Sequence, residues 1–155
     1  MEHDRSEWER HPGFEGMAGL LMHIHDSFRA SSAALVRLAD ETLDDHVLAR
    51  MRALYIPLER TLHHHHHAEE VMLFPLLRDL GGQDPSALVD DHGALMARLD
   101  EVTAALGVPS ASLAGLLRTL DDELRDHLDR EEAAAVPVLL EMTPAQAARL
   151  FHGLG

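Results

Sequence analysis

The chain lacks cysteine, and that absence removes a whole set of site chemistries. Without thiolates it can form no disulfide, no iron–sulfur cluster and no cysteine-ligated zinc site, and it has no cysteine nucleophile. Any metal ion bound by this protein must therefore be held by histidine, aspartate or glutamate.

Aromatic residues, basic residues and long apolar runs are also scarce. Aromatics make up 4% of the chain, and valine and isoleucine together number 10, against 27 leucines and 21 alanines. This balance favours helix over sheet. Thirteen basic residues face 27 acidic ones, a net charge of −14, which excludes nucleic-acid binding through a basic footprint.

No apolar run approaches the roughly 18 residues that a membrane span needs. The polar start of the chain has no apolar signal-peptide region. We therefore expect a cytoplasmic protein with neither nucleic acid nor membrane as a partner.

Helical periodicity divides the 155 residues into an arm, a bundle and a tail. We expect a loosely ordered arm over 1–15, a bundle over 16–141 and a short helix within 142–155. The fold class is all-α, an antiparallel up-down four-helix bundle with a short extra C-terminal helix. The bundle helices are predicted over about 15–40, 46–80, 85–107 and 110–141, with N-caps at Asp44 or Asp45, Asp84 and Ser110 and kinks at Pro57 and Pro75.

A motif of the form H-x-x-x-E-E-x-x-x-x-P occurs twice, at 65–75 and at 127–137. Each copy follows a helix that carries one well-placed histidine, His25 before the first and His92 before the second. Two helical hairpins therefore present the same types of metal ligand.

The spacing within each motif places a histidine and a glutamate on one helix face, because residues four apart lie one turn apart. These faces are otherwise apolar, and a buried carboxylate is costly unless it is paired or bound to metal. We predict two metal ions that share the carboxylates, with iron as the leading metal and manganese or zinc as alternatives. Without metal, at least one carboxylate should have a raised pKa. The predicted ligands are His25, His65, Glu69, His92, His127 and Glu131.

The chain has 13 histidines, five of them consecutive at 63–67. A helix cannot turn all five inward, and His65 is the predicted ligand. His66 lies three residues before Glu69 and is left open as an extra ligand or as a hydrogen-bond donor to the ligands. The remaining histidines are predicted to be exposed or to lie outside the ligand shell: His3, His11, His23, His46, His63, His64, His67 and His152.

The motifs together resemble the hemerythrin-like (HHE cation-binding) domain family over about residues 16–141. The matching segments are His25-Asp26, the motif from His65 into Leu73-Phe74-Pro75, Asp91-His92, and the motif from His127 to Glu132. The resemblance implies a non-haem di-iron centre in a four-helix bundle, with bridging carboxylates and an oxo or hydroxo bridge. Members of the family bind or sense O2, handle iron, or act on peroxide or nitric oxide.

Two positions depart from the pattern of oxygen-carrying members. Leu88 stands where they have a further histidine, and the last motif is H-x-x-x-E rather than H-x-x-x-x-D. One imidazole fewer leaves an open metal position unless His66 or solvent fills it. The leading function is binding of O2 or a related small ligand, peroxide or nitric oxide, with redox turnover as an extension. The alternatives are an oxidase or oxygenase with an organic substrate near 133–135, metal buffering, and sensing.

Overall fold

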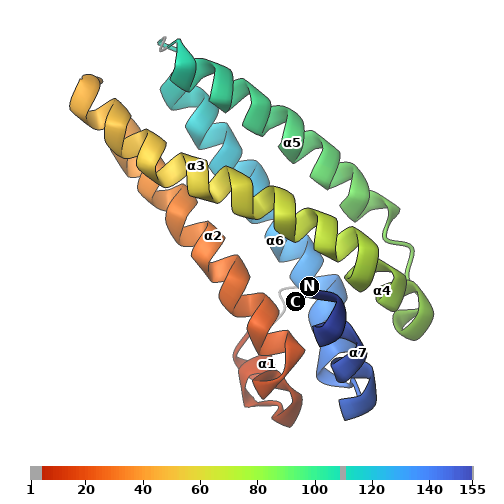
Figure 1. Cartoon of the computed structure of the whole chain (residues 1–155). Helices are drawn as coiled ribbons and strands as arrows, with labels where there is room; N and C mark the ends of the chain where they lie inside the picture. Colours follow the sequence, from red (N-terminus) through yellow and green to blue (C-terminus); the bar gives the residue numbers. More distant parts are fainter. Residues whose placement is uncertain (1–4, 109–110, 155) are drawn as a thin grey trace.

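The structure, a computed structural model, describes residues 5–108 and 111–154, with side chains as far as residue 149. Four long helices form an antiparallel up-down bundle (Figure 1). This confirms the predicted all-α fold. The bundle helices are α2 (Met17–Ala39), α3 (Asp45–Ala68), α5 (Ser86–Gly107) and α6 (Leu113–Leu140).

Short polar residues and glycine set the helix ends. The Asp44 carboxylate accepts a hydrogen bond from the Val47 N–H at 2.8 Å and caps α3 as predicted. Before α5, the Asp84 carboxylate accepts from the Ser86 N–H at 3.0 Å. Gly82 ends α4 (Phe74–Gly81) with a φ of 61°, a left-handed conformation that glycine adopts without strain. The predicted cap Ser110 lies outside the described residues.

The two prolines of the second long helix act differently. Helix α3 continues through Pro57 without a break, so a break there is excluded and a kink stays a prediction. Near Pro75 the helix changes form: Glu69–Leu73 is a π-helical turn, closed by the Phe74 N–H donating to the Glu69 carbonyl. Pro75 then lies in the first turn of α4, where a missing N–H costs nothing.

The first residues are not the loose arm that the sequence predicted. Residues 5–15 form α1 (Arg5–Arg10) and a 3-10 turn (Pro12–Glu15). Arg5 donates to the Asp26 carboxylate on α2 at 2.9 Å, and His11 lies 2.9 Å from the Glu141 carboxylate at the end of α6. These contacts between distant segments fasten residues that have little helical pattern of their own. Helix α7 (Pro144–Leu154) stands where a short last helix was expected.

The buried side chains form two apolar cores with a polar layer between them. One core includes Leu62, Leu99 and Leu124, and the other includes Leu77 and Leu88. All four bundle helices pass from the first core to the second through a layer of buried histidines and glutamates. Burial of each large apolar side chain contributes roughly 1.5–3 kcal/mol, so the two cores stabilise the bundle on both sides of this layer.

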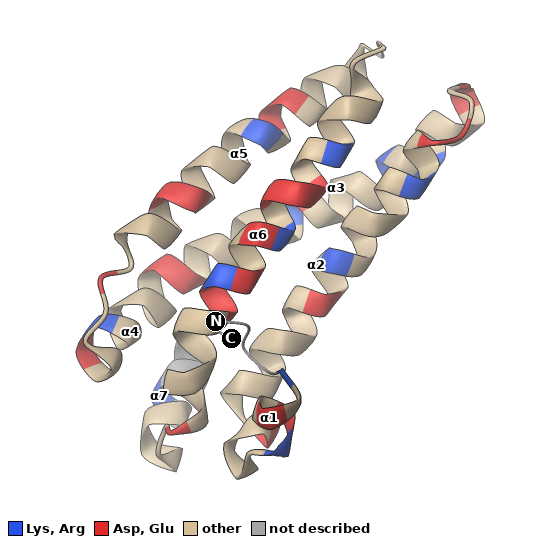
Figure 2. Ribbon diagram, turned by 180° about the vertical axis from the view of Figure 1, so that it is seen from behind, with Lys and Arg blue, Asp and Glu red and all other residues tan. Residues whose placement is uncertain are grey.

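Acidic and basic residues are spread along the bundle helices (Figure 2). Ion pairs join α2 to α6, including Arg29 with Asp129 at 2.9 Å and Arg118 with Asp40 at 2.6 Å. None of the described helices combines the length and the hydrophobicity needed to cross a bilayer. Location in the cytoplasm stays a prediction from the sequence.

Candidate metal centre

Helix geometry places Glu69 between His65 and His66. At about 100° per residue, Glu69 lies roughly 40° around the axis from His65 and roughly 60° from His66. One carboxylate can therefore serve two neighbouring imidazoles. The Glu69 Oε2 atom lies 3.1 Å from His65 Nε2, and its Oε1 atom lies 3.4 Å from His92 Nε2 on α5.

The buried layer contains two groups of side chains that could each hold a metal ion. In each group the ligand atoms lie within 4.8 Å of one another. We call the two groups site A and site B. The structure thus brings together all six predicted side chains and adds His66, which is only 4% exposed. Site A consists of His25, His65, Glu69 and Glu131, and site B consists of His66, Glu69, His92 and His127.

Glu69 belongs to both sites, whereas Glu131 belongs to site A only. At site A, Glu131 Oε2 lies 3.0 Å from His25 Nε2 and Glu69 Oε2 lies 3.1 Å from His65 Nε2. Toward site B, the Oε1 atoms of Glu69 and Glu131 lie 3.4 and 3.8 Å from His92 Nε2. Both carboxylates thus lie between the two groups, and their sharing by two ions stays a prediction.

The atoms that converge on the two sites are poorly satisfied by the protein itself. The Nε2 atoms of His25 and His65 are 3.2 Å apart and share one hydrogen bond, with donor and acceptor set by which ring carries the proton. Buried polar atoms almost always have partners, so this set fits metal ions that the protein would bind. Among the described residues, the buried side-chain atoms without a hydrogen bond are both ring nitrogens of His66, both carboxylate oxygens of Glu69 and Glu131, and Nε2 of His92 and His127.

An outer ring of carboxylates orients three of the imidazoles. A hydrogen bond from Nδ1–H to a carboxylate leaves the Nε2 lone pair free to bind metal. The sequence analysis missed these three acceptors, although two of them are the second glutamate of each repeated motif. The pairs are His25 Nδ1 with Glu132 at 2.7 Å, His92 Nδ1 with Glu70 at 3.0 Å, and His127 Nδ1 with Asp91 at 3.1 Å.

Without metal, protons supply the positive charge of the layer. Burial lowers the pKa of His92, but the neighbouring carboxylates of Glu131 and Glu69 outweigh burial and raise it to about 10. The pKa of His25 is likewise raised well above its ordinary value. Burial opposes ionisation of Glu69, yet contacts with His25, His65 and His92 hold its pKa well below the usual range. The prediction of a raised carboxyl pKa was therefore wrong for Glu69.

His66 behaves differently from these protonated imidazoles. Burial, together with the nearby His92, lowers the pKa of His66 to about 2, so its ring is neutral at physiological pH. The ring stacks on that of His92, with centroids 3.8 Å apart and an angle of 10° between the planes. His66 thus brings a third imidazole to site B. Leu88, at the position where oxygen-carrying members of the family have a further histidine, supplies none. Leu88 instead packs in the apolar core.

The two hairpins are related by a repeat that is broken near the metal ligands. His25, His65, Glu69 and Glu70 of the first hairpin correspond to His92, His127, Glu131 and Glu132 of the second. Three of the aligned positions next to the ligands hold residues of different chemical type in the two hairpins. His66 corresponds to Leu128, Ile24 to Asp91, and Ala68 to Arg130.

The break gives the two sites different surroundings. Asp91 holds His127 and also accepts from Arg130 at 2.8 Å, which closes the surface over site B. Within the described chain, His65 has no such carboxylate. The His65 side chain is 11% exposed, compared with 0% for His25, its partner at site A.

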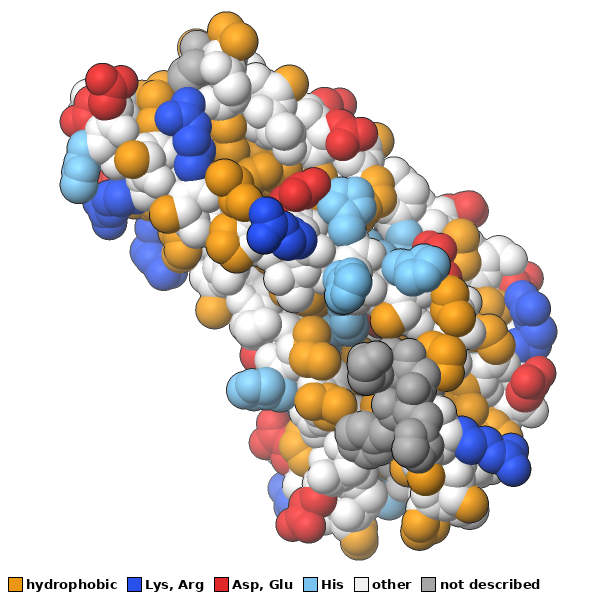
Figure 3. All heavy atoms as spheres, in the orientation of Figure 1, with side chains coloured by type: hydrophobic (Ala, Val, Ile, Leu, Met, Phe, Trp, Pro, Cys, Tyr) orange, Lys and Arg blue, Asp and Glu red, His pale blue; other side chains and the backbone are white. Residues whose placement is uncertain are grey.

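The other histidines lie outside both sites. His23, His46, His63, His64 and His67 are exposed, in line with the prediction. His11 is half-buried, and its Nδ1 accepts from the Gly13 N–H at 2.9 Å. His3 and the side chain of His152 lie outside the described residues. Histidine side chains gather midway along one face, next to hydrophobic side chains (Figure 3).

A comparison with protein families agrees with this geometry. The model of the hemerythrin HHE cation-binding domain matches residues 17–139, which include every member of sites A and B. The chain belongs to this family. Neither a curated protein nor a solved structure matches it. Family membership and the buried histidine–glutamate layer together make the layer a candidate metal centre.

Proposed function

We propose that the chain holds two iron ions, one at site A and one at site B, and binds O2, peroxide or nitric oxide at site A. The main support is the inequality of the ligand sets: site B gathers three imidazoles and site A only two. The carboxylates divide the other way, two at site A and one at site B, and His65 of site A keeps 11% of its side chain exposed. Manganese and zinc suit the same nitrogen and oxygen donors, and iron is preferred because of the family.

When bound, two iron ions supply a redox-active centre that attracts anionic ligands. Two divalent ions bring four positive charges and the two bridging glutamates return two negative ones, so two positive charges remain. The imidazoles add no charge when they act as ligands. Azide is therefore a suitable probe.

The chain's own residues prepare this centre in three ways. The two bridging carboxylates fix the spacing of the sites. Glu132, Glu70 and Asp91 hold protons at Nδ1 of three ligands, which keeps each Nε2 directed inward. Apolar side chains on both sides exclude water, Phe28 among them, with its ring 5.2 Å from that of His65.

Iron content and ligand titration test the proposal. We expect two iron ions per chain, a saturable visible band on addition of azide, and a spectral change when the reduced protein meets O2. His65→Ala should weaken azide binding strongly, whereas His63→Ala, at an exposed position of the same helix, should not. A band that persists unchanged in His65→Ala, or a content of one ion or none, contradicts the assignment.

Turnover separates the remaining roles. Steady consumption of O2 or peroxide indicates an enzyme, and a reversible spectral change without consumption indicates binding or sensing. Metal buffering predicts iron or zinc release without either signal. An organic substrate is a second candidate, because a cavity reaches His65 and Glu69.

A further inference from the structure

The first hairpin has a cavity where the second hairpin has an ion pair. In the second, Arg130 and Asp91 lie 2.8 Å apart beside His127. The repeat puts Ala68 at the position of Arg130 and Ile24 at the position of Asp91. Alanine and isoleucine can neither span this space nor pair across it. A pocket is left between α2 and α3, which we call the α2–α3 pocket.

The size of the α2–α3 pocket exceeds what a diatomic ligand requires. Its volume is about 310 Å³, and at its mouth Leu20 is 37% exposed. One water-sized group takes ~30 Å³, so the pocket has room for up to about ten such groups, or about ten non-hydrogen atoms. Its described lining consists of Met17, Leu20, Leu21, Ile24, Thr61, His64, His65, Ala68, Glu69, Leu73 and Leu139.

The lining selects for a neutral, apolar molecule. It contains no arginine among its described residues, and the ionisable groups of its described wall are His64, His65 and Glu69. The Thr61 hydroxyl already donates to the Pro57 carbonyl at 2.7 Å. Both oxygens of Glu69 are directed to sites A and B. Most of the remaining wall is aliphatic, and burial of apolar surface is its main source of affinity.

We propose that the α2–α3 pocket binds a neutral, mainly apolar organic molecule of up to about ten non-hydrogen atoms, with one end beside His65 and Glu69. The inference rests on the proposed function for the reactivity at that end. The pocket itself exists in the protein fold. The first hairpin lacks the ion pair of the second and has room for a second molecule next to site A.

The test uses the full chain loaded with zinc, which is diamagnetic, and two probes of equal size, cyclohexanol and cyclohexylammonium. Amide shifts in NMR spectra should show saturable binding of cyclohexanol centred on Ile24, His64 and Ala68. Cyclohexylammonium should bind at least about tenfold more weakly, because the pocket would desolvate its charge. The metal-free protein should give the same order of preference.

Variants locate the probe. Ala68→Arg combined with Ile24→Asp restores the ion pair of the second hairpin and should abolish cyclohexanol binding. Ala68→Leu, a milder filling of the pocket, should weaken it by about tenfold or more. Ala49→Leu, at an exposed position of the same helix, should leave it unchanged. The zinc content of each variant is measured separately, so failure of the metal proposal is distinguishable from failure of this one.

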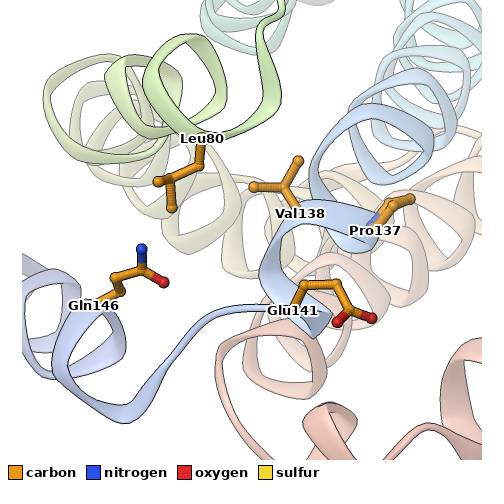
Figure 4. Close-up of a pocket in the computed structure, with 5 residues that line it drawn as sticks. All are labelled: Leu80, Pro137, Val138, Glu141 and Gln146. Carbon is orange, nitrogen blue, oxygen red and sulfur yellow. The ribbon is translucent and has the colours of Figure 1, made fainter.

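Three results would overturn the inference. The first is cyclohexanol binding that survives both filled-pocket variants, and the second is equal binding of the two probes. The third is a set of shifts centred on another cavity, of about 390 Å³, between α4, the end of α6 and α7 (Figure 4). That cavity is lined by Leu80, Pro137, Val138, Glu141 and Gln146 and includes no member of site A or B.

Discussion

Sites A and B share Glu69 and differ in most of what surrounds it. Site B has three imidazoles, two of them stacked on each other, and the Arg130–Asp91 pair lies on its outer side. Site A has two imidazoles, and a pocket opens beside one of them. The two hairpins thus repeat the same ligand types but differ at the neighbouring positions.

The comparison shows how two helical hairpins with the same repeated motif can form two sites with different properties. The closed site suits an ion that holds the helices together, since its ligands come from α3, the π-helical turn, α5 and α6. The open site suits an ion that exchanges a ligand. Three substitutions between the hairpins, His66 for Leu128, Ile24 for Asp91 and Ala68 for Arg130, account for the difference.

The largest expected effect comes from removing one of the two carboxylates that lie between the sites. Glu131→Ala and Glu69→Ala each take two carboxylate oxygens from the layer and leave buried imidazoles without a counter-charge. We expect metal content to fall below about one ion per chain and the melting temperature to drop with it. Glu101→Ala, at an exposed position, is the control. Elemental analysis with full occupancy of both sites in either variant would refute the bridging role.

A smaller effect concerns pH. As the pH rises, the metal-free protein should lose stability, whereas the additional stability that bound metal provides should increase. The pKa of His92 is about 10 in the folded metal-free chain and about 6.5 when unfolded. Its stabilisation is therefore complete below about pH 6.5 and is lost as the pH rises toward 10. Metal binding needs neutral imidazoles and releases these protons, so the stabilisation by metal grows with pH.

Melting curves check this prediction at about pH 6 and about pH 9, with and without zinc. We expect the metal-free protein to melt lower at the higher pH and the gap to the zinc-loaded protein to widen. A metal-free melting temperature that rises over this range would mean that His25 and His92 do not carry the charge of the layer.

The smallest effect should separate the two sites. Asp91→Asn weakens the acceptor of His127 and Glu132→Gln that of His25, so each variant acts on one site. Loss of such an outer partner lowers metal affinity by about 10–100-fold. Zinc titration should show one weakened ion in each variant. Asp126→Asn, at an exposed position, serves as the control, and simultaneous weakening of both ions would contradict independent orientation.

The sequence predicted most of what a single helix can reveal. Spacing of four residues between a histidine and a glutamate on an apolar face pointed to four of the side chains that the structure brings together, and the histidine on each preceding helix, His25 and His92, supplied the other two. Their ligation of metal stays a prediction. His66 was left open because its direction depends on packing against His92, a contact between helices. The outer acceptors Glu70, Glu132 and Asp91 were missed for the same reason.

The same limit explains the errors outside the centre. A kink or break was expected at Pro57, and packing on both sides of it keeps α3 unbroken. The first residues were expected to be loose, and their order comes from Arg5 and His11 reaching Asp26 and Glu141. Contacts between residues so far apart in the chain produce no periodic pattern, so the sequence periodicity could not predict them.

The π-helical turn at Glu69–Leu73 already holds one residue more than a regular α-helical turn. Insertion of a further residue here would turn everything downstream by about 100° about the helix axis. Phe74, whose ring lies 5.2 Å from that of His92, and Leu77, which is fully buried, would then both leave their places. Val71 in the same turn is exposed and lies in neither core, whereas Glu69 belongs to both sites. This segment therefore constrains its own length as well as the identity of Glu69.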